Sequence, residues 1–466
     1  MRGDLNARAA RAVTVPRWPS KRAPLRRRVI EEYNLLDFKP QLNTSSYVNV
    51  VFEPEEVEVA GRGMAINIAD QTIYPGSFKL HNDCLNMVAE LWHCPKPASF
   101  DEYGCYPGAG TVGSTEACLL AGLALKFRWR AWYAARHGLS AVEARREIPS
   151  MVISTCFQAA WEKLFRYMDV EPVFVSPSVG TFTVAAVDVA AAVDERTCGV
   201  VCIMGNHYGG QYDNVGAIAA ALRAVNGKKG YQVGIHVDGA SGAFVAPFQS
   251  EVAPWDFRVP EVLSVSGSGH KFGESVVGTG WVVWRDRKDL SEHVAVNVSY
   301  LGGKGESYTL NFSRPATGPY VQLYKLLRLG RDGFASKVAN QMATAKFIRD
   351  GLRKMVGPDG KTARFAMLDA GDSGWCAVAA PPPPRARPAS DRVPRRAACP
   401  SSRPRSIRRF ASRTTTSTCR RLSPSATGTS PATRWVSTTR SPRSESRSSP
   451  TRRWTAPCSA SSSSPT

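Results

Sequence analysis

The sequence lacks any continuous run of about eighteen apolar residues, the length that a membrane-spanning helix needs. It also lacks an apolar signal-peptide core near its start. No CxxC pair occurs among its eleven cysteines, a pattern that argues against a zinc site and favours reduced thiols in an intracellular protein. We therefore expect a cytoplasmic protein with no membrane partner and no metal, although an Arg-rich N-terminus leaves organelle targeting open.

Acidic residues are nearly absent from the last part of the chain. From Pro381 to Thr466 there are eighteen arginines, no lysine, and only two acids, Asp391 and Glu445. This tail therefore carries a net charge of +16 out of +21, which leaves +5 for the other 380 residues. A basic tail can contact nucleic-acid phosphates. No aromatic platform or binding fold accompanies this one, so we do not expect nucleic acid as a partner.

Hydrophobic periodicity is also absent from residues 381–466, where Ser, Arg, Thr and Pro alternate loosely. Such a composition cannot bury enough apolar surface to offset the entropy of ordering. Two explanations stay open: a disordered basic tail, or a frameshifted reading of a GC-rich gene, which the lack of lysine among so many arginines favours. The Arg-rich arm at 1–28 is also expected to be disordered.

The chain between the N-terminal arm and the basic tail is long enough for two or three domains. From Asp70 to Phe365 its pattern alternates between helix and strand. Apolar segments flanked by helical stretches predict buried parallel strands at 200–204, 234–238 and 262–266. The helix over 218–225, which we expect to end at Gly227, leads into the second of these strands. Crossovers of this kind predict an α/β fold with a doubly wound sheet.

The segment GTVGSTEA at 110–117 precedes a long amphipathic helix, Ala117 to His137. The apolar face of that helix includes Leu119, Leu120, Leu123 and Phe127. Free amides and the helix dipole favour a phosphate at such a terminus, and the hydroxyls of Ser114 and Thr115 add donors. Serine and threonine are also ordinary N-caps, so this motif alone does not decide between the two functions.

Asp238 ends the apolar strand within HVDGASGAFVAPF, residues 236–248. A buried carboxylate needs a partner, and a pyridinium nitrogen would provide one while keeping a bound cofactor electron-withdrawing. A helix cap or a structural salt bridge is the alternative. The small residues Ala240, Ser241 and Gly242 would let a flat ring lie close to the backbone.

Lys271 follows the next strand within SVSGSGHKFG, residues 264–273, between His270 and Gly273. Lysines usually lie on solvated faces, so this residue alone is a weak signal. Together the three motifs give a phosphate site, a buried acid for a ring nitrogen and then a lysine for an aldehyde. This is the order that a Schiff-base enzyme needs.

Several segments resemble the glutamate decarboxylases, pyridoxal-phosphate enzymes of the aspartate-aminotransferase fold type (fold type I). The resemblance covers residues 30–378. The segments that carry it are GTVGSTEACLLAGLALKFRWR (110–130), QAAWEKLFRYMDV (158–170), HVDGASGAFVAPF (236–248), SGHKFG (268–273) and LNFSRPATGPYVQLYKLLRLGRDGF (310–334). It implies conversion of L-glutamate to 4-aminobutyrate and carbon dioxide by a homodimer or higher oligomer. Another substrate of the same chemistry, or an impaired homologue, stays open.

The resemblance also implies residue roles. Lys271 would bind the cofactor covalently, Asp238 would face its ring nitrogen, and His270 or Lys271 would return a proton to the product. Ser46 and Tyr47 would line the substrate pocket. The cofactor-binding set implied in this way is Ser114, Thr115, Gln158, Asp238, Ala240, Ser268, His270, Lys271 and Ser313, the last reaching the phosphate of a neighbouring subunit.

The implied domains are an N-terminal segment at 29–80, a large cofactor-binding domain with a mixed, mostly parallel sheet at 81–330, and the start of a small C-terminal domain at 331–380. Two features depart from the family. Gly209 stands where a threonine is usual, which His207 or Tyr208 would have to compensate. After Val378 nothing matches the domain that supplies an arginine for the α-carboxylate.

Overall fold

The structure is a computed structural model. It describes residues 23–37, 39–43, 48–49, 51–97, 104–178, 181–290, 294–298 and 305–366. All of these belong to the first of two compact units, Met1–Ala386. The predicted pocket residues Ser46 and Tyr47 and the predicted tail at 381–466 lie outside the described residues.

A seven-stranded sheet forms the centre of the described unit, with the strand order β1-β7-β6-β5-β4-β2-β3. Strands β2 to β6 run parallel, whereas β7 is antiparallel to both of its neighbours. The bounds are β1 Gly108–Val112, β2 Ser150–Ser154, β3 Glu171–Val175, β4 Thr197–Ile203, β5 Gly234–Asp238, β6 Val262–Gly267 and β7 Thr279–Trp284. A separate hairpin pairs β8 Val296–Val298 with β9 Gly305–Ser307. The sheet confirms the mixed, mostly parallel α/β architecture expected from the sequence.

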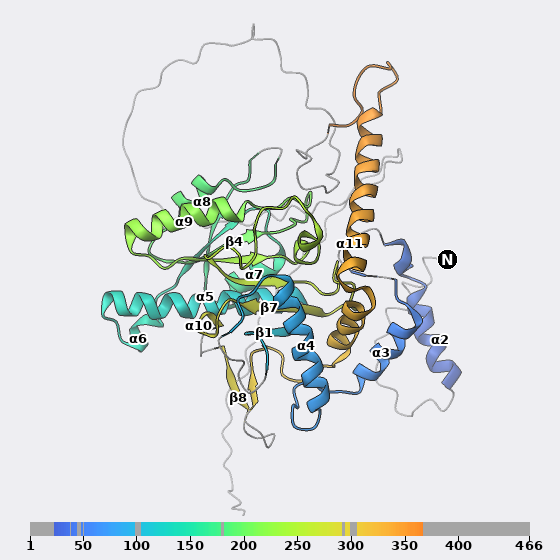
Figure 1. Cartoon of the computed structure of the whole chain (residues 1–466), viewed down its shortest axis with the longest axis horizontal. Helices are drawn as coiled ribbons and strands as arrows, with labels where there is room; N and C mark the ends of the chain where they lie inside the picture. Colours follow the sequence, from blue (N-terminus) through green and yellow to red (C-terminus); the bar gives the residue numbers. More distant parts are fainter. Residues whose placement is uncertain are drawn as a thin grey trace, which may run out of the picture. The chain divides into compact units, whose positions relative to one another are not determined.

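Helices cover both faces of this sheet and extend beyond its edge (Figure 1). The α-helices are α2 Ala23–Asn34, α3 Pro54–Met64, α4 Pro75–Leu91, α5 Gly113–His137, α6 Ala141–Ala144, α7 Ala159–Tyr167, α8 Ala186–Ala192, α9 Val215–Lys229, α10 Arg287–Leu290 and α11 Thr317–Lys354. Single-turn 3-10 helices are η1 Pro40–Leu42, η2 Gly242–Phe244 and η3 Ala246–Phe248. Among the described residues, no helix combines the length and apolar character that a bilayer span requires.

Side chains of β4 point alternately to the two faces of the sheet and so contribute to two separate core clusters. Val200 and Cys202 pack into the core cluster that contains α4 and α9, whereas Val201 and Ile203 pack with α5 and α7. Successive strand residues point to opposite faces, so one apolar run supplies both cores. The predicted buried strands are confirmed, because β4, β5 and β6 contain or closely match the three apolar runs.

One predicted helix end is wrong, and two further helices cross expected boundaries. Helix α9 continues through Gly227 and ends at Gly230, which takes the left-handed conformation with φ +69 that glycine tolerates. Helix α2 begins at Ala23, inside the arm that the composition predicted to be disordered. Helix α11 crosses the predicted domain boundary at residue 330, although non-helical angles at Gly330 divide it there.

His81 of α4 holds the edge strand β1 in place. The amide of Gly110 donates to His81 Nε2 at 2.8 Å, and His81 Nδ1 lies 3.0 Å from Asn82 Oδ1. A ring nitrogen that accepts from an amide carries no proton, so the ring is neutral with its proton on Nδ1. Burial accordingly lowers the pKa of His81 to about 4. His81 therefore serves the scaffold that leads into α5.

We expect the folded protein to lose stability as the pH falls from about 6.5 to 4. Burial also lowers the pKa of His236 to about 4. Below pH 6.5 the unfolded chain binds protons that these buried rings reject, which costs up to about 3 kcal/mol per histidine. Asp213 has the opposite effect on stability. Burial raises its pKa to about 6, so protonation below that pH removes the cost of a buried negative charge. The stability lost through the two histidines exceeds the stability gained through this one carboxyl group.

Urea unfolding at pH 6.5 and 4.5 measures this effect. The variant His81→Gln should show a smaller difference between the two pH values than the wild type, whatever its absolute stability. His137→Gln, which removes a half-exposed histidine at the end of α5, is the matched control. An equal pH dependence in His81→Gln and the wild type would contradict the assignment.

Candidate active site

Asp238 lies at the carboxyl end of β5 with only 5% of its surface exposed. The indole Nε1 of Trp161 in α7 donates to its Oδ2 at 2.7 Å, and the amide of Ala240 donates to its Oδ1 at 3.1 Å. Both oxygens are thus held by neutral donors, which fixes the carboxylate without neutralising it. The buried acid expected from the sequence is present, and both of its oxygens accept from neutral donors.

A polar stripe continues below Asp238 on the α5 and α7 side of the sheet. His236 bonds to Ser264 Oγ at 2.8 Å and to Ser266 Oγ at 3.1 Å, and Ser266 Oγ lies 3.7 Å from Cys118 Sγ in α5. Our sequence reasoning did not identify this network. The signal was available, because IHVD and LSVS alternate apolar and polar residues in two strands that pair side by side.

Lys271 lies in the turn that follows β6, the strand next to β5. Parallel strands end at the same edge of a sheet, so this turn comes beside Asp238. The Nζ of Lys271 lies 3.5 Å from Ser241 Oγ. Burial lowers the pKa of Lys271 from its ordinary value, and the negative charge of Asp238 opposes this. A larger fraction of the amine is therefore neutral and nucleophilic than in a solvent-exposed lysine.

The first turn of α5 faces the same region. Its first residue, Gly113, has φ +74, and the preceding Val112 has no side chain that could cap the helix. A Cβ on Gly113 would lie 3.6 Å from the ring of His270, so that ring packs against the start of the helix. Ser114 and Thr115 are half-buried in this turn. The amide of Gly113 donates to Gly278 O at 3.0 Å. The amides and hydroxyls of Ser114 and Thr115 are therefore the donors in this turn that suit a phosphate group.

His270 contributes through a fixed tautomer. Its Nδ1 donates to the carbonyl of Thr279 at 2.7 Å, which leaves Nε2 without a proton when the ring is neutral. Burial lowers the pKa of His270 and the positive charge of Lys271 lowers it further. The ring is thus a neutral packing and accepting group near pH 7, better placed to orient a ligand than to supply a proton.

Ser268 supports the fit of a phosphorylated, ring-containing cofactor. Its Oγ is buried and has no hydrogen-bond partner within the described part of the chain. Its amide donates to Ala240 O at 3.3 Å, which places it between the Asp238 segment and Lys271. An orphaned hydroxyl of this kind calls for an acceptor from outside the chain. With the α5 terminus, Asp238 and Lys271, it forms a donor set suited to pyridoxal phosphate.

Gln158 occupies a different position from these residues. It is exposed, and its side-chain oxygen accepts from the amide of Ala160, so it caps the start of α7. Three residues later the same helix supplies Trp161, the partner of Asp238. The cap therefore places α7 over the site. Stacking of Gln158 on a cofactor ring stays a prediction.

Ser313 is exposed on the segment before α11, where its Oγ lies 3.2 Å from Asn67 Nδ2. The prediction that it reaches a phosphate in a neighbouring subunit concerns an assembly, so it stays a prediction. Gly209 has a clearer explanation. A Cβ there would lie 2.4 Å from the amide of Gln211, which lies 3.2 Å from Asn206 Nδ2. The Gln211 amide thus fills the space that a threonine side chain would need.

Comparison with known proteins agrees with this geometry. The family model described as "Pyridoxal-dependent decarboxylase conserved domain" matches residues 58–358. Glutamate decarboxylase 5 of Arabidopsis thaliana is 37% identical over 324 residues, which cover 70% of this chain and 64% of that protein. Glutamate decarboxylase alpha of Listeria monocytogenes is 39% identical over 292 residues, 63% of this chain and 61% of that one. The chain thus spans less than two thirds of the length of each of these two relatives.

A probable glutamate decarboxylase gamma of Listeria innocua is 34% identical over 347 residues, 74% of this chain and 72% of that protein. Among solved structures, a glutamate decarboxylase of Lactobacillus brevis superposes with a TM-score of 0.70 at 33% identity, covering 78% of this chain and 79% of that one. A sphingosine-1-phosphate lyase of Burkholderia pseudomallei, with a TM-score of 0.60 at 24% identity, shares the fold.

Proposed function

Because the chain belongs to the pyridoxal-dependent decarboxylase family, whose cofactor is pyridoxal phosphate, we propose that it converts L-glutamate to 4-aminobutyrate and carbon dioxide. The observation that carries the proposal is the convergence of Lys271, Asp238 and the first turn of α5 at one edge of the sheet. The names and identities of the curated relatives support glutamate as the substrate.

Each group in this arrangement has a distinct task. The amides of the α5 first turn, with Ser114 and Thr115, would bind the phosphate, and Ser268 Oγ would donate to it. Asp238 would hold a proton on the ring nitrogen, since two neutral donors fix its carboxylate at that place. When bound, pyridoxal phosphate supplies an electron-withdrawing ring that accepts the electron pair left when carbon dioxide departs.

Lys271 has two roles in this proposal. Burial lowers the pKa of Lys271, so more of its Nζ is neutral and nucleophilic toward an aldehyde than in a solvent-exposed lysine. With cofactor and substrate bound, the same Nζ would hold the proton that is delivered to the carbon that has lost carbon dioxide. His270 is a weaker candidate for that second step, because its Nδ1 proton is held by the Thr279 carbonyl. The His270 ring instead packs against the start of α5.

We also propose that the protein forms a homodimer and that it is located in the cytoplasm. Val112, Val277 and Phe312 leave apolar side chains exposed along segments next to the α5 terminus or Ser313. A second copy covering them would remove this apolar surface from water. It would also bring its own Ser313 segment toward the site. The buried free thiols of Cys118 and Cys202 suit a reducing compartment.

Release of labelled carbon dioxide from several amino acids tests the substrate assignment. The full chain, supplied with pyridoxal phosphate, should release it from L-glutamate at least about a hundredfold faster than from L-glutamine, because an uncharged amide leaves a site built for a carboxylate unpaired. L-aspartate, one methylene shorter, probes the depth of the pocket. Faster release from an aromatic amino acid than from glutamate would overturn the assignment while leaving the decarboxylase chemistry in place.

A further inference from the structure

The turn that carries Lys271 is closed by its own backbone. The amide of Ser275 donates to Gly269 O at 2.8 Å, and the amide of Glu274 donates to Lys271 O at 3.1 Å. Glu274 itself has φ +61, a left-handed conformation that non-glycine residues adopt rarely. Such an outlier persists only where the surroundings impose it, and here it lies three residues from the reactive amine.

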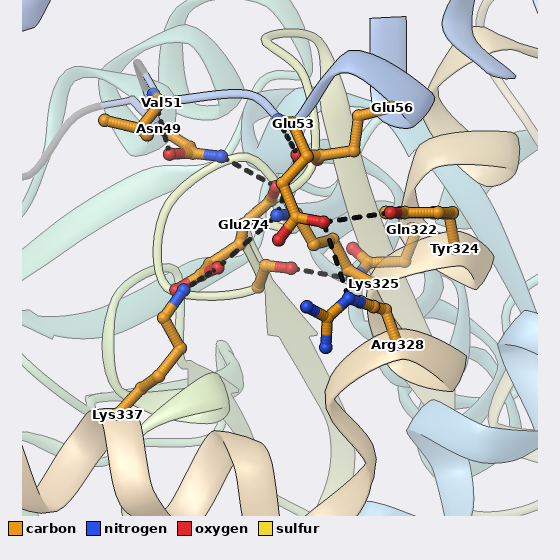
Figure 2. Close-up of polar contacts among 11 residues, drawn as sticks. Asn49, Val51, Glu53, Glu56, Glu274, Gln322, Tyr324, Lys325, Arg328 and Lys337 are labelled. Atoms are coloured by element: carbon orange, nitrogen blue, oxygen red, sulfur yellow. Dashed lines mark hydrogen bonds and ion pairs between the residues drawn. The ribbon is translucent and has the colours of Figure 1, made fainter. Parts of the chain in front are cut away.

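Helix α11 contacts this turn through two side chains one helical turn apart. The Gln322 amide donates to Gly273 O at 3.0 Å, and its oxygen accepts from Trp281 Nε1 at 3.2 Å. One turn later, Lys325 Nζ lies 3.9 Å from the carboxylate of Glu274. Figure 2 shows Gln322 and Lys325 on one side of Glu274 and Lys337, further along α11, on another, where it pairs with the same carboxylate.

The N-terminal segment contacts the turn from another side. The backbone amide of Asn49 donates to His270 O at 2.7 Å, and its side-chain amide donates to Glu274 O at 2.9 Å. One asparagine thus bridges residues on both sides of Lys271. Figure 2 shows its side chain directed toward Glu274. The segment continues into α3, whose Glu56 lies 2.8 Å from Lys325 Nζ. The same lysine therefore links α3, α11 and the turn.

The charges in this cluster are balanced and mostly withdrawn from water. The side chains of Lys325, Glu56 and Glu274 are exposed by 4%, 1% and 13%, and Lys337 supplies the second cation. Buried ion pairs are weak contributors to stability, because desolvation offsets their attraction. Their directional contacts do fix the relative positions of the segments that carry them. A role in positioning accounts for the cluster better than a role in stability.

We propose that Glu274 and Asn49 are positioning residues that hold the Lys271 amine in the geometry needed to attach an aldehyde. The inference rests on the proposed function, in which Lys271 binds pyridoxal phosphate. Glu274 fixes the turn to α11, and Asn49 fixes it to the N-terminal segment. Neither residue needs to contact the cofactor, so binding of the phosphate and ring should be independent of both.

The test compares two ligands of the full chain. Pyridoxal 5'-phosphate reports both binding and covalent attachment, whereas pyridoxine 5'-phosphate has an alcohol in place of the aldehyde and reports binding alone. Attachment is followed by absorbance and confirmed by borohydride reduction and mapping of the modified peptide. Glu274→Gln is the first variant because Lys325 keeps Glu56 as its partner. Lys325→Met would instead leave a buried carboxylate unpaired and endanger folding.

Asn49→Ala is the second variant, because it removes the side-chain donor and keeps the backbone contact. Glu261→Gln is the matched control. Its side chain is also 13% exposed and pairs with Arg223 at 2.7 Å, but it precedes β6 at the end away from Lys271. We expect both test variants to attach the aldehyde about tenfold more slowly, since misplacement of a reacting group costs effective concentration. Affinity for pyridoxine phosphate should stay within about twofold in all three.

Two results would overturn the proposal. Unchanged attachment in folded Glu274→Gln and Asn49→Ala would show that the turn does not need these contacts. A parallel loss of attachment and of pyridoxine phosphate affinity would show a general structural defect. If the wild type forms no reducible adduct at Lys271, the proposed function itself fails and takes this inference with it. That outcome is distinct, because it appears before any variant is made.

Discussion

Replacing Lys271 by alanine should abolish the visible absorbance of the protein saturated with pyridoxal phosphate and lower carbon dioxide release by about four orders of magnitude. The turn after β6 places Lys271 beside Asp238, and burial lowers the pKa of its amine. Without this amine, the turn at 268–275 holds no other lysine that could attach the aldehyde. Binding of the cofactor through its phosphate should persist, because Ser114, Thr115 and the α5 amides are untouched.

Lys271→Arg separates charge from nucleophilicity. The guanidinium keeps the positive charge near Asp238 but does not attach an aldehyde, because it stays protonated at any ordinary pH. It should lose attachment as completely as alanine does. Lys228→Ala, at the end of α9, removes a lysine far along the chain from the motif and should behave as the wild type. A visible band that survives in Lys271→Ala would show that another lysine holds the cofactor.

The features of this site that the sequence predicted are those that depend on residues close together in the chain. A parallel strand that is buried on both faces consists of a short run of mostly apolar residues. The sequence therefore predicted β5 with its observed bounds, Gly234–Asp238. Residues that follow neighbouring parallel strands must meet at one edge of the sheet. The order of Asp238 and then Lys271 along the chain predicted one site, and the structure places the two residues beside each other.

The end of helix α9 was less predictable, because two glycines that could each end it occur close together. Gly227 and Gly230 lie about one helical turn apart, and either could end α9. Only Gly230 adopts the left-handed conformation, which depends on the turn that leads into β5. Gln158 shows a similar limit. Its role in ring stacking stays a prediction, and the sequence did not indicate that its side-chain oxygen caps α7.

The contacts that fix the Lys271 turn could not be read from the sequence. Asn49 and Glu274 are 225 positions apart, and nothing in either local pattern indicates the other. Lys325 would be assigned to a solvated helix face by its residue type, yet it is 3% exposed. Pairings of this kind arise from tertiary packing, in which one buried charge is tolerated only because another lies beside it.

Asp238→Asn should lower turnover by about three orders of magnitude while leaving cofactor attachment at Lys271 largely intact. The amide has nearly the shape of the carboxylate but carries no charge, so it cannot hold a proton on the ring nitrogen. It also loses one accepted hydrogen bond. The donors from Trp161 and Ala240 each need an oxygen, and asparagine offers only one. Some loss of thermal stability should accompany the loss of turnover.

Trp161→Phe separates these two effects. It removes the 2.7 Å donor to Asp238 Oδ2 and keeps both the carboxylate charge and an aromatic ring at this position. If charge on the ring nitrogen dominates, this variant should lose only about tenfold in turnover. Equal losses in Trp161→Phe and Asp238→Asn would mean that orientation of the carboxylate matters as much as its charge. Normal turnover in a folded Asp238→Asn protein would remove Asp238 from the mechanism, because no charge would then remain at that end of β5.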